Sequence, residues 1–357
     1  MTAPGGAVSW ELAERVAIRV AGATPTASSF QRASLQADFT ELTAKAELLV
    51  ERETGLVSLE GLARARVTDR AGWIQANLAS FQRLLQPVIA KLGSRVSTGL
   101  LAPASRSATG AQVGALLGWM SRRVLGQYDL LLVEDDRPED QDIVYYVGPN
   151  ILELERRFAF PTREFRLWLA LHEVTHRVQF TGIPWMRKHF LSMVAEGIDS
   201  LDPDPRQLIR GLKRAIGEVT AGRNPLSEGI IGLLANPEQV EILDRIQGLM
   251  SLLEGHGDVT MDRAAVAEIP NAGRFSRILH ERRVSVNGPG KVLRQAVGIE
   301  AKMRQYEQGE KFIAAVERAG GRELMDQAWQ GPAWLPTLAE IREPQRWLSR
   351  VGVASGR

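Results

Sequence analysis

Helical periodicity dominates the first third of the chain. Apolar residues recur at intervals of three and four through residues 10–21, 29–54, 73–92 and 110–125. This spacing places them on one face of an α-helix. The sequence therefore predicts that the chain opens with a group of amphipathic helices.

The last of these helices carries glycine at every fourth position, at Gly110, Gly114 and Gly118. Such a stripe lets two helix backbones approach closely, either in a membrane or in a protein core. The apolar run ends at Arg122-Arg123 and is too short to span a bilayer. We therefore expect close packing against another buried helix.

Two short apolar runs, 128–133 and 143–147, flank the charged turn at 134–140 and predict a β-hairpin. A strand with a free edge can bind an extended peptide, which adds to the sheet as a further strand. Residues 143–147 are either such an edge or a strand that is paired on both sides.

The rest of the chain returns to helical patterns, at 185–200, 206–221, from Asn236-Pro237-Glu238 onward, 274–285 and 291–317. The predicted fold class is mainly α with a small β-hairpin or sheet (α+β). At 357 residues the chain exceeds the usual size of one domain. We expect a two-lobed structure, with a lobe at 1–190 that contains the sheet and a helical lobe at 191–357.

Composition narrows the function classes. The 44 basic and 42 acidic residues are interspersed, which argues against a nucleic-acid binder. Cysteine is absent, so disulfides, thiol nucleophiles and thiolate metal ligands are excluded. No leader and no long apolar run occurs, and we expect a soluble, cytoplasmic protein. The oligomeric state is open.

The most informative segment is His172-Glu173-Val174-Thr175-His176. Two histidines four apart on a helix lie one turn above each other, so both can bind one Zn²⁺, and the glutamate after the first can hold the attacking water. A pair of core histidines that hydrogen bond to carbonyls or carboxylates is the alternative. The motif predicts a zincin-type hydrolase.

The surrounding sequence predicts a buried helix around this motif. Pro161-Thr162 offers an N-cap, Glu164 puts negative charge in the first turn, and Gly182 signals the end. The segment between them is apolar on nearly every face. Burying two imidazoles and a carboxylate there without partners would be costly, which favours a bound metal.

A catalytic zinc needs a third protein ligand, and Glu254 is the leading candidate. Asp258, one turn further on, could accept a hydrogen bond from the N–H of a ligating histidine without binding the metal itself. Gly255 and Gly257 indicate that another backbone approaches this helix, and the metal helix is a plausible neighbour. His256 and Glu196 are the alternative third ligands.

An oxyanion donor is also expected, and residue type alone nominates Tyr306, His280 and His256. The alternatives are a tyrosine whose hydroxyl lies at the surface and histidines that are partly exposed and have no catalytic role.

Several separate blocks resemble a zincin-like family of actinobacteria and Chloroflexi that is labelled as hydrolases associated with deazaflavin-coenzyme biosynthesis. The blocks are DRAGW at 69–73, VLGQYD at 124–129, YVGPN at 146–150, HEVTH with QF at 179–180 and PW at 184–185, LEGH at 253–256, and KMRQY at 302–306 with Gly309. The resemblance covers most of the chain and implies a zincin-like fold.

Together these features predict a zinc-dependent, metallopeptidase-like hydrolase. His172, His176 and Glu254 would hold Zn²⁺, and Glu173 would be the general base acting on a peptide or other small amide substrate. The alternative is a catalytically inactive zincin scaffold that binds a partner protein or peptide. We expect neither nucleic acid nor membrane as a partner.

Overall fold

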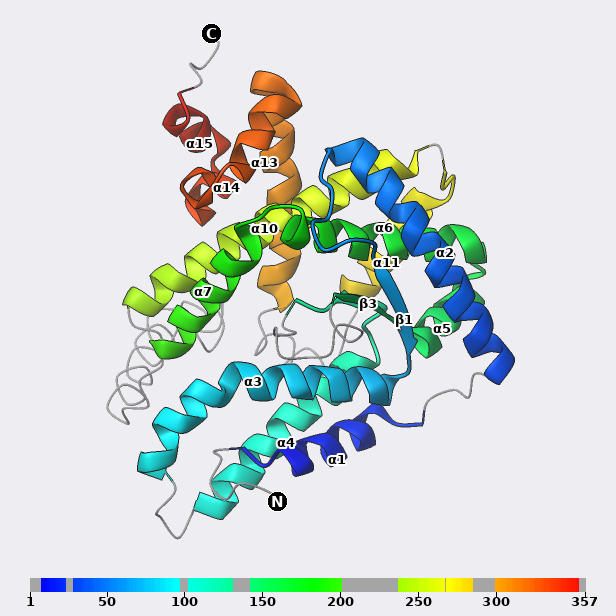
Figure 1. Ribbon diagram of the computed structural model, residues 1–357, viewed down its shortest axis with the longest axis vertical. Coiled ribbons are helices and arrows are strands. Elements are labelled where there is room, and N and C mark those ends of the chain that lie inside the picture. Colours follow the sequence, from blue (N-terminus) through cyan, green and yellow to red (C-terminus); the bar gives the residue numbers. More distant parts are fainter. Residues whose placement is uncertain are drawn as a thin grey trace. The chain divides into compact units, whose positions relative to one another are not determined.

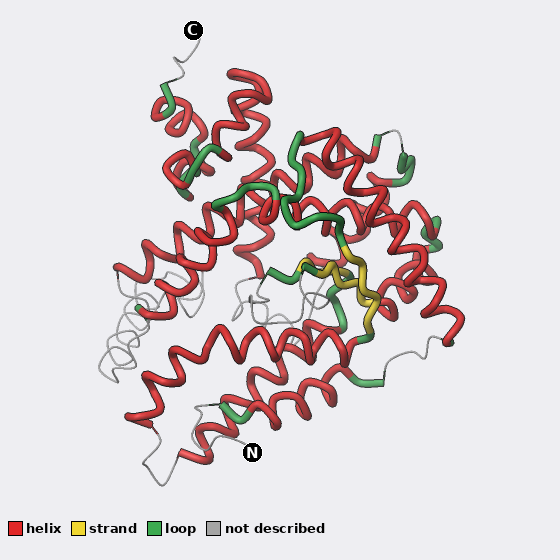
Figure 2. The backbone as a smooth tube through the Cα atoms, viewed as in Figure 1, coloured by secondary structure: helices red, strands yellow, loops and turns green. Residues whose placement is uncertain are grey.

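The computed structural model describes residues 8–23, 28–96, 102–130, 142–200, 237–266, 268–284 and 299–352. They are mainly helical with one small sheet, which confirms the predicted fold class (Figures 1 and 2). The helix expected at 206–221 lies outside these residues. The chain divides into two compact units, the first made of Met1–Gly182 and Ala264–Ala272, the second of Ile183–Arg263 and Gly273–Arg357.

The helices of the first unit are α1 (Trp10–Ala21), α2 (Ser29–Thr54), α3 (Arg70–Val96), α4 (Ala102–Ser121), α5 (Gly148–Phe158) and α6 (Thr162–Thr181). The bounds of α1 and α2 are those that the periodicity predicts. A reciprocal capping box between Ser28 and Gln31 fixes the start of α2. The sequence analysis missed α5, because its Gly148-Pro149 start is typical of a loop.

The glycine stripe of α4 packs against α1, side by side in Figure 1. A Cβ atom on Gly114 would lie 2.3 Å from the carbonyl oxygen of Ala13, and one on Gly118 would lie 2.4 Å from that of Ala17. Ala13 and Ala17 are themselves fully buried. The expected close packing of two buried helices is confirmed.

A three-stranded sheet stands beside these helices, with the strand order β1-β3-β2. β1 (Arg64–Thr68) runs parallel to β3 (Ile143–Val147), and β2 (Gly126–Tyr128) runs antiparallel to β3. The pairing of β2 with β3 agrees with the expected hairpin, but β2 shares only Tyr128 with the strand expected at 128–133, of which 131–133 lie outside the described residues. β3 is paired on both sides and all its residues are buried, so of the two alternatives for 143–147 the fully paired strand is confirmed and the free edge is excluded.

The outer edge of β1 is covered by side chains of α2. The amide of Gln36 donates to the carbonyl of Ala65 (2.9 Å) and accepts from the N–H of Val67 (2.8 Å), as a neighbouring strand would. The carboxylate of Glu47 accepts from the N–H of Ala63 just before β1. Edges covered in this way do not add a further strand. The outer edge of β2 pairs with no other strand among the described residues.

The second unit is helical wherever the structure describes regular elements. It contains α7 (Met186–Asp199), most of α10 (Pro237–Ala265) and α11 (Ala272–Val284), then α13 (Ile299–Asp326), two 3₁₀ turns (Gln327–Trp329 and Pro332–Trp334), α14 (Leu338–Arg342) and α15 (Pro344–Arg350). Leu252, Phe312 and Trp347 form the centre of its core.

Gly255 of α10 meets α13, within the second unit. A Cβ atom on Gly255 would lie 2.4 Å from the carbonyl carbon of Gly309, and one on Gly309 would lie 2.0 Å from the carbonyl oxygen of Ser251. The prediction of a close approach is confirmed for Gly255, and the backbone that approaches it is that of α13. The two glycines bring these helix backbones together.

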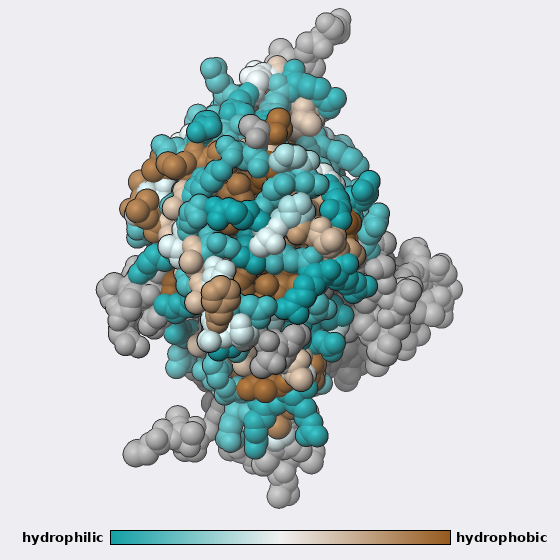
Figure 3. All heavy atoms as spheres, turned by 90° about the vertical axis from the view of Figure 1, so that its right-hand side faces the viewer, coloured by the Kyte–Doolittle hydropathy of each residue, from teal (hydrophilic) through white to brown (hydrophobic). Residues whose placement is uncertain are grey.

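On the face shown in Figure 3, the described residues are mostly hydrophilic, with groups of apolar atoms between the polar and charged side chains. Within the described part of the chain, no helix is both long and apolar enough to cross a membrane.

Candidate metal and catalytic site

Helix α6 carries the HExxH motif and is buried along most of its length. Its N-terminal residue Pro161 makes no side-chain cap, so the predicted cap at 161–162 is wrong. The first turn is held by Glu164, whose carboxylate accepts from both the backbone and the side-chain N–H of Asn271, each at 3.0 Å. The helix ends where predicted, with the N–H of Gly182 bound to the carbonyl of Val178.

The two motif histidines lie on one face of α6 with their ring centroids 4.7 Å apart, nearly perpendicular. Both rings are partly exposed, whereas their neighbours Leu171, Val174 and Thr175 are fully buried. One turn of helix therefore presents two imidazoles from an otherwise apolar surface, as the spacing predicts.

The orientation of His176 is fixed from within its own helix. Its Nδ1 lies 3.0 Å from Oε1 of Gln179, which is fully buried. A carbonyl oxygen can only accept, so Nδ1 carries the proton and Nε2 keeps its lone pair for a metal. The sequence analysis did not assign this role to Gln179. An amide three residues after a candidate ligand is the signal that could have revealed it.

Glu173 points toward strand β2, where Gly126 lies against its side chain. Glu173 is only 7% exposed. A Cβ atom on Gly126 would lie 2.6 Å from Oε1, 2.7 Å from Cγ and 2.8 Å from Cδ of Glu173. Strand β2 can therefore pass this carboxylate only because residue 126 has no side chain. The sequence analysis gave Gly126 no role of its own.

The hydroxyl of Tyr146 lies close to the same region. Tyr146 is the cross-strand partner of Gly126, and its hydroxyl is 2.8 Å from that of Thr43. Burial raises the pKa of Tyr146 far above its usual range, and the negative charge of Glu173 raises that pKa further. Tyr146 is thus a neutral phenol beside the candidate base.

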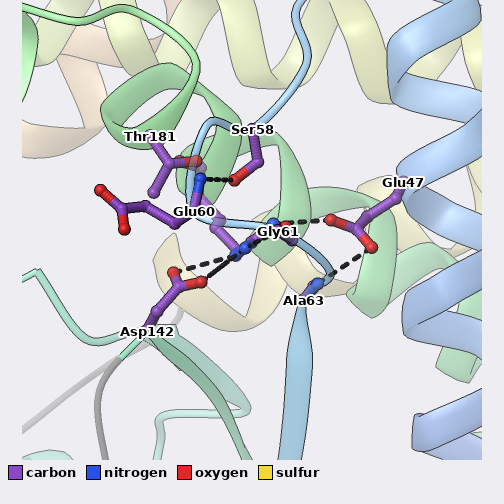
Figure 4. A network of polar contacts seen from close by, with 8 residues as sticks. Glu47, Ser58, Glu60, Gly61, Ala63, Asp142 and Thr181 are labelled. Atoms are coloured by element: carbon purple, nitrogen blue, oxygen red, sulfur yellow. Dashed lines mark hydrogen bonds and ion pairs between the residues drawn. The ribbon is translucent and has the colours of Figure 1, made fainter. Parts of the chain in front are cut away.

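Arg177, next to His176, ties α6 to α2 and to the segments just before β1 and β3. Its guanidinium is fully buried and binds Asp142 through Nε (2.9 Å) and Nη2 (2.5 Å), Glu47 through Nη1 (2.6 Å), and the carbonyl of Gly61 (2.8 Å). Figure 4 labels these three partners. Nearby, the N–H of Leu59 donates to the carbonyl of Thr181. Helix α6 is therefore held against α2 and the segments that lead into β1 and β3 by charge-assisted hydrogen bonds.

A His/His/Glu cluster is present. His172, His176 and Glu254 each offer one ligand atom, and these atoms lie within 4.8 Å of one another; no other such group of three occurs among the described residues. Glu254 belongs to α10 and is 4% exposed. The alternative ligand Glu196 is half exposed and forms an ion pair with Arg245 at 2.6 Å.

The remaining candidates lie in the second unit. The imidazole of His256 is buried and packs edge-on against Trp329, with ring centroids 5.1 Å apart. Asp258 hydrogen bonds to Glu310, a carboxyl whose pKa is raised chiefly by burial. His280 is exposed. Tyr306 lies in α13, and its side chain falls outside the described part of the structure. The roles suggested for these residues stay predictions.

A model of the zincin-like metallopeptidase family matches residues 8–348 of the sequence. The chain belongs to this family. Among solved structures, it is similar to a "putative hydrolase with a novel fold" from Chloroflexus aurantiacus, with 27% identity and a TM-score of 0.71 over 98% of this chain and 100% of the other. No curated protein matches the sequence.

Membership of the zincin-like metallopeptidase family supports a hydrolase and indicates a metal, typically zinc. The donors present suit that ion, because zinc accepts two imidazole nitrogens and one carboxylate oxygen as its protein ligands in catalytic sites. The hydrogen bond from His176 to Gln179 leaves the other ring nitrogen oriented as a ligand needs to be.

Proposed function

We propose that the protein is a zinc-dependent hydrolase that cleaves a peptide or other amide bond. The observation that carries this proposal is the cluster of His172, His176 and Glu254, with Glu173 directly after the first histidine. Two imidazoles and a carboxylate form a donor set for a catalytic zinc, and the buried glutamate supplies a base beside it.

In this proposal His172, His176 and Glu254 hold the ion, and Gln179 keeps His176 in the tautomer that binds. Bound Zn²⁺ would polarise the scissile carbonyl and lower the pKa of water toward 7. Glu173 takes the proton from the attacking water and passes it to the leaving amine.

The sheet supports an extended substrate that binds along β2. The carbonyl of Leu125 and the N–H of Asp129 form hydrogen bonds to β3. Because the direction of these groups alternates along an antiparallel strand, the N–H and C=O of Gly126 point away from β3, to the opposite edge. Gly126 is also the residue that touches Glu173. A peptide that adds to this edge would therefore pass beside the base. The covered edge of β1 offers no such path.

Metal analysis tests the ligand set. We expect purified protein, or protein loaded with zinc, to hold about one zinc per chain, and His176→Ala to lose it, since two ligands bind far more weakly than three. His189→Ala is the matched control, because His189 packs against Trp185 and belongs to no donor cluster among the described residues. A wild-type protein that stays free of zinc after loading would refute the proposal.

Glu173→Gln separates a hydrolase from an inactive scaffold. The variant keeps the shape of the side chain and the zinc ligands but lacks the base, so cleavage in a peptide library should fall by about 10²–10⁴-fold with zinc content unchanged. Cleavage that is equally fast in the variant would exclude Glu173 as the base. If the wild type binds peptides without cleaving them and the variant binds equally well, the scaffold function is the right one. An association with deazaflavin-coenzyme biosynthesis stays a prediction from the resemblance.

A further inference from the structure

We propose that Gly126 is a positioning residue for Glu173: the missing side chain at position 126 sets where the carboxylate of the base lies. The proposal deepens the proposed function and rests on it only for the role of Glu173 as a base. The contact between Gly126 and Glu173 lies within the first unit, and it can be tested without any substrate.

The contact is unusually close, and Glu173 provides its nearest atoms. The three atoms nearest to a Cβ on Gly126 are Oε1, Cγ and Cδ of Glu173, at 2.6–2.8 Å. Carbon atoms in contact normally lie at about 3.5–4.0 Å. A methyl group at position 126 would therefore force the carboxylate to move by roughly 1 Å, the difference between these distances.

The backbone at Gly126 does not itself require glycine. Its φ lies outside the positive range that excludes other residues, so an alanine could adopt the same conformation. Glycine within a strand costs stability, because it loses more conformational freedom on folding than alanine does. A glycine here is thus unfavourable for the strand and is explained by the neighbouring carboxylate.

The neighbours of Glu173 restrict where a displaced carboxylate could go. The side chain is buried, and α6 is held in place by the four-point network of Arg177. Tyr146, which pairs with Gly126 across the strands, is fully buried and stacks on Phe39 with ring centroids 3.8 Å apart. These packed groups oppose movement toward the sheet, so we expect a displaced carboxylate to rotate about its own side-chain torsions.

A thermal double-mutant cycle in metal-free protein tests the contact. Gly126→Ala in the wild-type background should lower the Tm by about 2–4 °C, the shift of roughly 1 kcal/mol in a unit of this size. In the Glu173→Ala background the clash is gone, so the same substitution should leave the Tm unchanged or raise it by a similar amount. The sign of the shift should thus depend on residue 173.

Gly273→Ala is the matched control, because a Cβ on Gly273 meets no atom within 4 Å and its φ is ordinary. Its effect should be equal in both backgrounds. If Gly126→Ala shifts the Tm equally in both backgrounds, as Gly273→Ala does, Gly126 is an ordinary strand glycine and the proposal is wrong.

The catalytic consequence is measured separately in the zinc-loaded enzyme. A displacement of about 1 Å at a reacting group costs about 10²-fold, so Gly126→Ala should lower kcat/KM by about that factor with zinc content retained. In the Glu173→Gln background it should lower the residual rate by less than twofold. An equal loss in both backgrounds would overturn the positioning role. A peptide screen in which the wild type cleaves nothing counts against the proposed function. The thermal double-mutant cycle then still shows whether residue 126 contacts the side chain of Glu173.

Discussion

Removing the buried guanidinium of Arg177 should strongly destabilise the first unit. Arg177→Met preserves much of the volume of the side chain but leaves the carboxylates of Asp142 and Glu47, whose side chains are only 11% and 14% exposed, without their cation. Breaking a buried ion pair from one side costs about 3–5 kcal/mol. The carbonyl of Gly61 also loses a donor.

Urea unfolding followed by circular dichroism measures the lost free energy of unfolding, and thermal unfolding measures the change in Tm. At about 2–4 °C per kcal/mol for a unit of this size, the Tm should fall by roughly 6–20 °C. Arg163→Met, on the same helix, is the matched control: its side chain is 58% exposed and pairs with the exposed Glu41, so about 0–1 kcal/mol is expected. If both substitutions cost the same small amount, the network contributes no more than a surface pair and the reasoning fails.

A second variant tests whether the loss comes from the uncompensated carboxylates. Adding Asp142→Asn and Glu47→Gln to Arg177→Met removes both negative charges and should restore part of the lost free energy of unfolding. A triple variant less stable than Arg177→Met would show that the cost arises from packing and not from buried charge.

Two further outcomes follow from buried contacts of the first unit. Gly114→Ala should destabilise the protein by about 1–3 kcal/mol in urea unfolding, because the new methyl group would press on the carbonyl of Ala13; an unchanged midpoint would contradict the close crossing of α1 and α4. Burial raises the pKa of Tyr146 in the folded state, so its stability contribution is complete below about pH 10, the ordinary pKa of tyrosine, and is lost progressively at higher pH. The free energy of unfolding of Tyr146→Phe should therefore fall less steeply at alkaline pH than that of the wild type. An identical dependence on pH would show that Tyr146 is not the cause of the alkaline decrease.

The local features of the sequence predicted much of this structure. The bounds of α1 and α2 follow from periodicity, and the glycine stripe of α4 from its spacing. In contrast, β1 is only five residues long, with a first residue exposed and the others partly exposed, so it lacks the apolar alternation by which a strand is recognised. Its pairing with β3 joins segments almost eighty residues apart, and no local pattern reports such a contact.

The candidate site shows the same division. HExxH predicted the helix, both imidazoles and the candidate base, because their geometry is contained in one turn of helix. The partners of that turn could not be predicted: the role of Gln179 depends on the hydrogen bond between its amide and His176, and that of Gly126 on the position of β2 against Glu173. The sequence left open whether β3 is an edge or a paired strand for the same reason, since this depends on β1.

The shortness of β2 limits how a substrate is selected. Gly126 and Tyr128 each turn one N–H and one C=O away from β3, and four such hydrogen bonds contribute about 2–6 kcal/mol in total. This is below the roughly 8 kcal/mol of a micromolar complex. If the proposed function is right, most of the discrimination between substrates must come from their side chains, and the protein should respond to the identity of residues around the cleaved bond more than to the length of the bound chain. So short an edge is also a poor template for pairing with the sheet of a second copy.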